Sequence, residues 1–293
     1  MTDAHAGAPT SRRVALVTGL DTHVLSWGDD AAHDHTVVLL HGFLDLAWEW
    51  AAIGAALGRH AHVVAPDLRG HGDTAWVGAG GYYHFFDYVA DVDDLVAQLG
   101  RARVSIVGHS MGASVAAYWA GTRPARVHRV ALLEGLGPPE ATADLPLRTA
   151  SWIDAWRKVR REPVRPMADL AEAAARIRRN DPTISDDDAR ALAARGTRAV
   201  DGGLVWKHDP LHRTMGPYPF RVDAAAAFWG RVTAPVLYLD GDRSLLRLPE
   251  PEVARRLAFF PDARRATIAG AGHALMRHQP AAVTSALASF LFG

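Results

Sequence analysis

Apolar residues along the chain alternate between short continuous runs and longer segments with helical spacing. Continuous runs such as Val37-Val38-Leu39-Leu40 are typical of strands covered on both faces, which favours a parallel sheet. The pattern predicts strands at 13–18, 23–27, 36–40, 62–65, 104–107, 127–133, 235–239 and 265–268, the first two antiparallel. It predicts helices at 47–57, 87–99, 111–121, 252–259 and 280–291. Strands that alternate with helices predict a doubly wound α/β domain.

The alternation is interrupted between residues 138 and 230. This stretch opens with Gly137-Pro138-Pro139, is rich in arginine and helical in pattern, and has no convincing strand before Pro235. We expect a helical cap, or lid, inserted above a core made of residues 1–137 and 231–293. The alternative is a group of peripheral helices with no role at the site.

Composition and charge narrow the class of protein. The 293 residues are 49% hydrophobic and 22% charged, which suits one large globular domain. The 32 basic residues balance 32 acidic ones, which gives no reason to expect a nucleic-acid partner. The absence of cysteine excludes disulfides, cysteine nucleophiles and thiolate metal sites. Abundant alanine, with arginine far outnumbering lysine, is typical of a GC-rich bacterial gene.

Residues 1–13 are small and polar, without the apolar core of a signal peptide. No apolar run reaches the roughly 18 residues that a membrane span needs. We therefore expect a cytoplasmic protein without a membrane span. The sequence carries no indication of the oligomeric state.

The motif Gly108-His109-Ser110-Met111-Gly112 lies between a predicted strand and a predicted helix. This is the context that a G-x-S-x-G nucleophile elbow requires. The turn is so tight that bulk at 108 or 112 would clash, and it exposes the Ser110 hydroxyl above the sheet edge. The helix N-terminus adds backbone N–H donors and the positive end of its dipole. We predict that Ser110 is a nucleophile; the alternative is a chance Gly-Ser-Gly turn.

The loop His41-Gly42-Phe43 directly follows the buried strand predicted at 36–40. A loop at this place can direct the Phe43 N–H toward the same point as the Met111 N–H. Two such donors form an oxyanion hole, in which each donor contributes about 3–4 kcal/mol of transition-state stabilisation. We predict an oxyanion hole from Phe43 and Met111, and a structural role for His41.

The sequence Gly270-Ala271-Gly272-His273 lies between the last predicted strand and the last predicted helix. A serine hydroxyl is a poor nucleophile until a base takes its proton. Imidazole suits this task at neutral pH, because its pKa is about 6.5. A histidine on a glycine-rich loop at a strand's carboxyl end is well situated to reach Ser110. We predict that His273 is the general base and that His278 lies on a surface helix.

These motifs, HGF, GHSMG and GAGH, together with the run 67–73 (DLRGHGD), resemble the α/β-hydrolase superfamily in sequence and in order. The resemblance covers nearly the whole chain outside the expected cap. It implies an α/β-hydrolase fold, with an eight-stranded, mostly parallel sheet and a site at the carboxyl edge of its strands. Residues 67–72 are structural in that family. Ser110 argues against the epoxide hydrolases and haloalkane dehalogenases of the superfamily, which have an aspartate there.

Two carboxylates compete for the role of triad acid. The usual superfamily pattern, Gly-x-x-Asp after the strand at 235–239, here reads Gly241-Asp242-Arg243-Ser244, so Asp242 lies two residues early. Glu134 follows the apolar run at 130–133. From Ser110, a helix of about 12 residues descends roughly 18 Å and a strand of about seven residues climbs back some 23 Å, which returns Glu134 to the catalytic edge.

We favour Glu134 as the acid, and this position resembles that of the acid in haloalkane dehalogenases. Asp242 is the alternative acid. A third possibility is that Glu134 only holds the hinge of the cap at 135–139.

The expected cap also contains Trp152, Trp156 and Trp206. Trp152 and Trp156 are four residues apart and share a helix face. The three side chains could bind substrate as the wall of an apolar pocket, or they could anchor the cap to the core. The arginines at 157, 160, 161 and 165 are typical of a solvated helix face, with a clamp for an anionic substrate as the alternative. No cluster has the spacing of a metal site, and we expect neither metal nor cofactor.

These residues predict a serine hydrolase that cleaves a small-molecule carboxylic ester or lactone through an acyl-enzyme. The fold does not fix the reaction. Hydrolysis of an activated C–C bond, as in the meta-cleavage-product hydrolases, is a second possibility. A non-catalytic ligand receptor on the same fold is a third.

Overall fold

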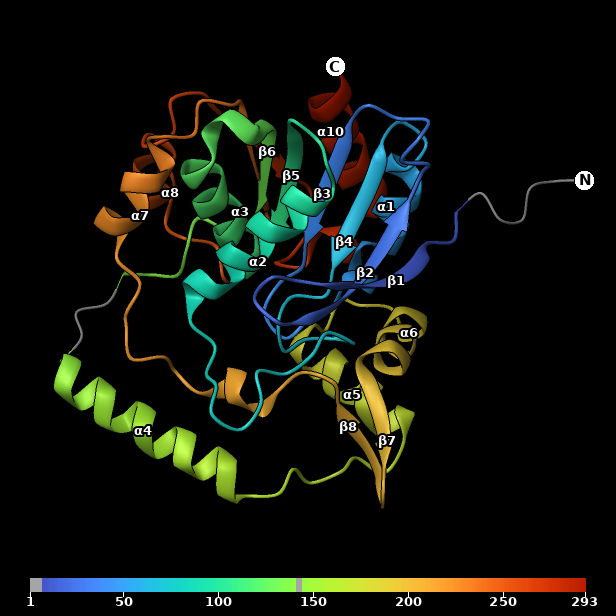
Figure 1. The fold of residues 1–293 in the computed structure, drawn as a ribbon, viewed down its shortest axis with the longest axis vertical. Coiled ribbons are helices and arrows are strands. Elements are labelled where there is room, and N and C mark those ends of the chain that lie inside the picture. The colour runs from blue at the N-terminus through green and yellow to red at the C-terminus, as the bar shows by residue number, and fades with distance from the viewer. Residues whose placement is uncertain (1–6, 141–143) are drawn as a thin grey trace, which may run out of the picture.

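The computed structural model describes residues 7–140 and 144–293. The first residues of the expected N-terminal tail and residues 141–143 of the expected cap lie outside the described part. The centre is an eight-stranded sheet in the order β1-β2-β4-β3-β5-β6-β9-β10 (Figure 1). Its strands are β1 (Thr10–Ala15), β2 (Asp21–Trp27), β3 (Thr36–Leu40), β4 (His62–Pro66), β5 (Val104–His109), β6 (Val127–Leu133), β9 (Val236–Gly241) and β10 (Ala263–Ile268).

The sheet is mostly parallel. β2 pairs antiparallel with β1 and with β4, and all the following pairs from β4 to β10 are parallel. The prediction of an eight-stranded, mostly parallel sheet is therefore confirmed. The first strand was predicted at 13–18 but spans Thr10–Ala15, because the turn from Leu16 to Leu20 takes up the following residues.

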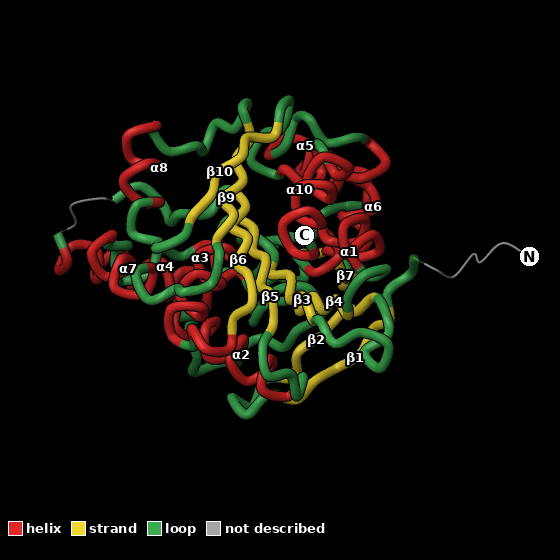
Figure 2. The backbone as a smooth tube through the Cα atoms, turned by 90° about the horizontal axis from the view of Figure 1, so that it is seen from above, coloured by secondary structure: helices red, strands yellow, loops and turns green. Residues whose placement is uncertain are grey.

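Helices cover both faces of the sheet, as Figure 2 shows from above. One face carries α2 (Phe85–Gln98), α3 (Met111–Thr122), α7 (Val222–Trp229) and α8 (Glu250–Leu257). The other carries α1 (Ala51–Leu57), α9 (Leu275–His278) and α10 (Pro280–Phe292). Short 3-10 helices are η1 (Ala47–Trp50), η2 (Pro124–Arg126) and η3 (Pro210–Arg213).

The two hydrophobic cores explain the continuous apolar runs of the sequence. In β3, Val38 and Leu40 pack in the core beneath α3, whereas Val37 and Leu39 pack in the core beneath α1 and α10. Successive side chains of a strand point to opposite faces, so a strand covered on both faces needs an apolar residue at every position. β3 is buried along its whole length.

The segment from 138 to 230 lies largely at one end of the sheet, at the bottom of Figure 1. It contains α4 (Leu145–Arg161), α5 (Leu170–Asn180), α6 (Asp186–Gly196), the hairpin of β7 (Thr197–Val200) and β8 (Gly203–Trp206), η3 and α7. The last helix, α7, instead packs against α3 of the core, where the backbone of Gly121 leaves no room for a Cβ beside Phe228.

The hairpin of β7 and β8 is absent from the strands predicted from the sequence. Each strand has only four residues, too few for an apolar alternation to be recognised. The hairpin turns at Asp201-Gly202, and Gly202 and Gly203 both have positive φ, at 84° and 141°. None of the described helices is long and apolar enough to cross a membrane.

Candidate active site

Ser110 lies at a sharp turn between β5 and α3. Its φ of 50° and ψ of −114° are unfavourable for a residue with a side chain, and its N–H donates a hydrogen bond to the carbonyl oxygen of Leu133 over 2.8 Å. A Cβ at Gly108 would collide with the backbone of Gly112, and a Cβ at Gly112 with the carbonyls of residues 40 and 41. The two glycines are therefore required by close packing around the turn.

Glu134 directly follows β6, and its side chain is almost completely buried. Oε1 accepts a hydrogen bond from the N–H of Gly241 over 2.8 Å, and Oε2 accepts one from Ser244 Oγ over 2.8 Å. His273 Nδ1 lies 3.2 Å from Oε2. Burial alone would raise the pKa of Glu134, but the hydrogen bonds from His273, Gly241 and Ser244 lower it below its usual value. The carboxylate is thus stabilised in its ionised form next to the imidazole.

Asp242 lies on the same loop as Ser244 but has a different partner. Its Oδ1 accepts a hydrogen bond from the N–H of Gly270 over 2.7 Å, so it joins two loops near the protein surface. Within the described residues it makes no hydrogen bond to His273. The structure therefore brings Glu134, and not Asp242, against His273. Ser244 occupies the position where the superfamily pattern has an aspartate, and its hydroxyl donates a hydrogen bond to the Glu134 carboxylate.

His273 lies on the loop between β10 and α9. Its imidazole is about a quarter exposed, and it lines the same cavity as Ser110. No hydrogen bond joins the two side chains in the described structure. Catalytic hydrogen bonds are often long before substrate is bound.

His109 connects the serine turn to the histidine loop, a role that the sequence analysis did not foresee. Its Nε2 lies 2.9 Å from the carbonyl oxygen of His273. Burial lowers the pKa of His109 to about 4, so the ring is neutral and Nε2 carries the proton that it donates. The G-x-S-x-G motif does not specify the residue before the serine, so the motif alone does not predict this contact.

The loop from His41 to Phe43 lies beside the serine turn. A Cβ on Gly42 would lie 2.7 Å from His109 Nδ1 and 3.5 Å from Ser110 Cβ. Among the described residues, no hydrogen bond uses the N–H of Phe43 or of Met111. Both amides are therefore available to a developing oxyanion, as the oxyanion-hole prediction requires.

His41 is buried behind this loop and stabilises the conformation of the loop. Its Nδ1 lies 2.7 Å from the carbonyl oxygen of Gly42, and its Nε2 accepts a hydrogen bond from the N–H of Leu68 over 2.8 Å. Burial lowers the pKa of His41 to about 4, so the ring is neutral. A neutral imidazole bonded through both nitrogens holds the loop in place.

A cavity of about 1160 Å³ opens over these residues. Ser110, His273 and Phe43 line it from the core side, and residues of α5, α6, β8 and η3 line it from the opposite side. Trp206 is part of its wall. Trp152 and Trp156 are not; their rings pack at 5.2 and 5.1 Å from the ring of Tyr82 in the core. Of the three tryptophans, only Trp206 is brought to the cavity. His278 also lines it, and its Nε2 pairs with Asp181.

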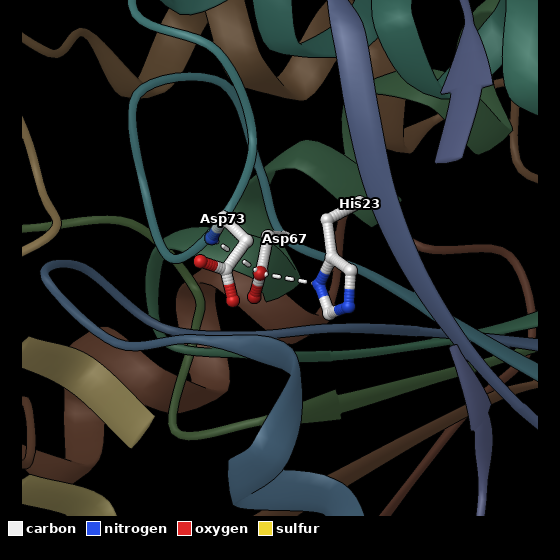
Figure 3. Close-up of side chains that lie close together, drawn as sticks. All are labelled: His23, Asp67 and Asp73. Carbon is white, nitrogen blue, oxygen red and sulfur yellow. Dashed lines mark hydrogen bonds and ion pairs between the residues drawn. The ribbon is translucent and has the colours of Figure 1, made fainter. Parts of the chain in front are cut away.

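A second cluster of polar side chains is formed by residues that do not line this cavity (Figure 3). His23, Asp67 and Asp73 lie close enough for a shared cation. However, the fully buried Asp67 already accepts hydrogen bonds from His23 Nδ1 over 2.7 Å, the N–H of Asp73 over 2.8 Å and the N–H of Ala47 over 2.6 Å. These donors satisfy both carboxylate oxygens, so Asp67 joins the 67–73 turn to β2 and η1 as a structural residue.

Known proteins resemble this chain in sequence and in fold. A serine hydrolase-like protein of Danio rerio is 30% identical over 274 residues, which cover 90% of this chain and 83% of that protein. A soluble epoxide hydrolase of a Corynebacterium species is 33% identical over 144 residues, covering 48% of this chain and 47% of that enzyme.

Two solved structures resemble nearly the whole chain. The thioesterase domain from the curacin biosynthetic pathway superposes with a TM-score of 0.83 at 27% identity, covering 96% of this chain and 99% of that one. A hypothetical protein of Pseudomonas aeruginosa PAO1 gives a TM-score of 0.84 at 30% identity, covering 96% and 97%. The model of the alpha/beta hydrolase family matches residues 37–286. With this match and this fold, the chain belongs to the alpha/beta hydrolase family.

Proposed function

We propose that this protein is a serine hydrolase that cleaves a carboxylic ester or lactone through an acyl-enzyme. The observation that carries the proposal is the pairing of the buried Glu134 carboxylate with His273, at a cavity that Ser110 also lines. A buried carboxylate paired with an imidazole can be structural, as Asp67 with His23 is. What favours catalysis here is that His273, the partner of Glu134, lines the same cavity as Ser110.

In the proposed first step, His273 Nε2 takes the proton of Ser110 Oγ while this oxygen attacks the substrate carbonyl carbon. The Phe43 and Met111 amides stabilise the negative charge that develops on the carbonyl oxygen. Glu134 accepts the hydrogen bond from His273 Nδ1–H, which fixes the tautomer and stabilises the imidazolium.

His273 then gives its proton to the leaving oxygen, the C–O bond breaks, and the acyl group remains on Ser110. In the second half of the reaction, His273 takes a proton from water while the water oxygen attacks the acyl carbon. The bond between this carbon and Ser110 Oγ then breaks, His273 returns the proton to Ser110 Oγ, and the acid is released.

The epoxide hydrolase relative does not favour epoxide opening here. Its similarity covers less than half of this chain, and the residue at the elbow is Ser110 instead of an aspartate nucleophile. We further propose that the part of 138–230 that precedes α7 acts as a cap over the site, since α5, α6, β8 and η3 contribute the wall opposite Ser110.

The test is active-site labelling combined with turnover. A fluorophosphonate probe should label the wild-type protein at Ser110 and leave folded Ser110→Ala unlabelled, and p-nitrophenyl esters or lactones should be hydrolysed only by the former. A folded wild-type protein that is neither labelled nor active on any of these substrates would contradict the proposal and favour a receptor.

A further inference from the structure

Charged side chains form part of the wall of the cavity above Ser110. Five arginines contribute to its wall: Arg176, Arg179, Arg213, Arg243 and Arg277. Only three carboxylates do: Asp45, Glu172 and Asp181. The balance of charge at the wall is therefore positive.

The three carboxylates are already engaged. Asp45 contacts Arg277, which also lies 3.2 Å from Glu49 Oε2 behind the wall. Glu172 Oε1 accepts a hydrogen bond from Arg176 over 2.6 Å.

The third carboxylate, Asp181, lies 2.8 Å from His278 Nε2. No acidic side chain of the wall is left to neutralise the remaining arginines.

Within the described residues, Arg179, Arg213 and Arg243 line the cavity without forming an ion pair. Among residues 7–140 and 144–293, the Arg213 guanidinium has one hydrogen-bond partner, His208 Nε2, at 3.3 Å. Burial lowers the pKa of His208 to about 4, so its ring is neutral and does not offset the charge of Arg213.

Arg243 is connected to the proposed catalytic groups through its backbone and through its neighbour Ser244. Its N–H donates a hydrogen bond to the carbonyl oxygen of Ala271 over 2.9 Å, on the loop that carries His273. The following residue, Ser244, donates to Glu134. The backbone of Arg243 is therefore fixed beside the reaction centre, while its side chain is exposed at the cavity.

Arg213 and Arg243 belong to different sides of the cavity. Arg213 lies on η3, on the side opposite Ser110, and Arg243 lies on the loop after β9 of the core. Apolar side chains occupy other parts of the wall, including Phe43, Leu46 and Trp206. The wall thus offers an apolar surface together with arginines that have no acidic partner among the described residues.

We propose that the substrate carries an anionic group, a carboxylate or a phosphate, which Arg213 and Arg243 bind while the apolar wall takes its hydrocarbon part. The inference rests on the proposed ester hydrolysis and deepens it. The planar guanidinium binds carboxylate and phosphate oxygens through two parallel N–H donors, and a positive cavity also attracts an anion from solution. The arginines predicted as a possible clamp, at 157, 160, 161 and 165, do not line the cavity.

The anionic group can belong to the acyl part of the substrate or to its leaving group. Three esters distinguish these two possibilities. Phenyl butyrate is the neutral reference, monophenyl glutarate carries a carboxylate on the acyl part, and 4-carboxyphenyl butyrate carries one on the leaving group. We expect kcat/KM of the wild type to be at least about tenfold higher for one anionic ester than for phenyl butyrate, the scale of one charge-assisted hydrogen bond.

Arg213→Ala and Arg243→Ala should each lower kcat/KM for that anionic ester by about 5- to 30-fold, and by at least about fivefold more than for phenyl butyrate. Arg213→Lys should restore part of the loss. Arg157→Ala is the matched control, because Arg157 is exposed on α4 outside the cavity, and it should leave the ratio of the two esters unchanged. Raising the NaCl concentration should also reduce the advantage of the anionic ester.

Binding to Ser110→Ala separates this inference from the proposed function, because it requires no turnover. Calorimetry should give at least about tenfold tighter binding of one anionic ester than of phenyl butyrate, again the scale of one such hydrogen bond. The anionic subsite would be contradicted if Ser110→Ala bound all three esters with equal affinity, or if the arginine variants lost kcat/KM equally for all three. Neither result would contradict ester hydrolysis. If Ser110→Ala binds an anionic ester tightly but the wild type hydrolyses none of the three esters, the proposed reaction would be contradicted and the anionic subsite retained.

Discussion

His109 donates a hydrogen bond from Nε2 to the backbone carbonyl oxygen of His273, over 2.9 Å. The two rings lie 4.9 Å apart between centroids. The contact joins the residue before the nucleophile to the residue that carries the proposed base, across 164 positions of the chain. It fixes the histidine loop to the serine turn through the backbone carbonyl, so His273 Nδ1 remains available to Glu134 and Nε2 to proton transfer.

This relationship gives the first prediction. His109→Leu removes the donor and should lower kcat about tenfold, the effect of losing one hydrogen bond of about 1.4 kcal/mol that positions the base. His109→Gln retains an N–H donor of similar reach and should keep most of the activity. Steady-state kinetics on one ester measure both, and equal losses in the two variants would mean that packing, and not the hydrogen bond, is what matters.

The second prediction concerns the strained backbone of Ser110. Ser110→Ala and Ser110→Gly should both lower kcat by about 10⁴-fold or more, because covalent catalysis is lost. Glycine tolerates a φ of 50°, whereas alanine does not, so Ser110→Gly should be more stable than Ser110→Ala by about 1 kcal/mol. Denaturant unfolding measures the difference. A less stable glycine variant would show that the turn is not strained.

The third prediction decides between the two carboxylates. Glu134→Gln should lower kcat at least about 100-fold, because an amide does not stabilise the imidazolium of His273. Asp242→Asn should change kcat by no more than about threefold, as expected for an exposed side chain. Both variants are to be compared on one ester after circular dichroism has shown that they are folded. The reverse ranking would transfer the role of the acid to Asp242.

The fourth prediction follows from the lowered pKa of Glu134. Between the lowered pKa of the folded state and the ordinary value of the unfolded state, the unfolded chain binds more protons, so stability rises with pH in that range. The contribution of Glu134 is therefore complete above the unfolded pKa and is lost as the pH falls through the folded pKa. The difference in free energy of unfolding between wild type and Glu134→Gln should be largest at neutral pH and shrink in acid. A difference that stays constant down to pH values well below the usual carboxyl range would refute this linkage.

The fifth prediction separates the tryptophans. Trp206→Ala enlarges the cavity that Trp206 lines, and should raise KM for long-chain esters more than for acetates. Trp152→Ala removes a ring that packs on Tyr82 and Trp156, and should chiefly lower the melting temperature. An ester-length series and thermal unfolding of both variants provide the test. A chain-length effect of Trp152→Ala as large as that of Trp206→Ala would place Trp152 in the binding pocket as well.

Much of the fold and part of the candidate site could be inferred from the sequence alone. The continuous apolar run of β3 specified a strand covered on both faces, and the alternation of strands with helices specified a doubly wound α/β domain. The α/β-hydrolase fold followed from the resemblance of the motifs to that superfamily. Ser110 and His273 could be proposed from local motifs, because a tight turn needs small residues at fixed positions around it. Such requirements act over a few residues and are therefore visible in the order of residues.

Other features depended on contacts between distant segments. Glu134, Ser244 and His273 meet only because the loops after three parallel strands converge at one edge of the sheet. The same convergence directs Asp242 to Gly270. The hairpin of β7 and β8 is too short for its pattern to be recognised, and only packing separated Trp206 from Trp152. The orientation of η3 and of the loop after β9 likewise decides which arginines face the cavity. The sequence does not reveal this, because an arginine on a solvated surface and an arginine at a binding site have the same charge and can have the same spacing.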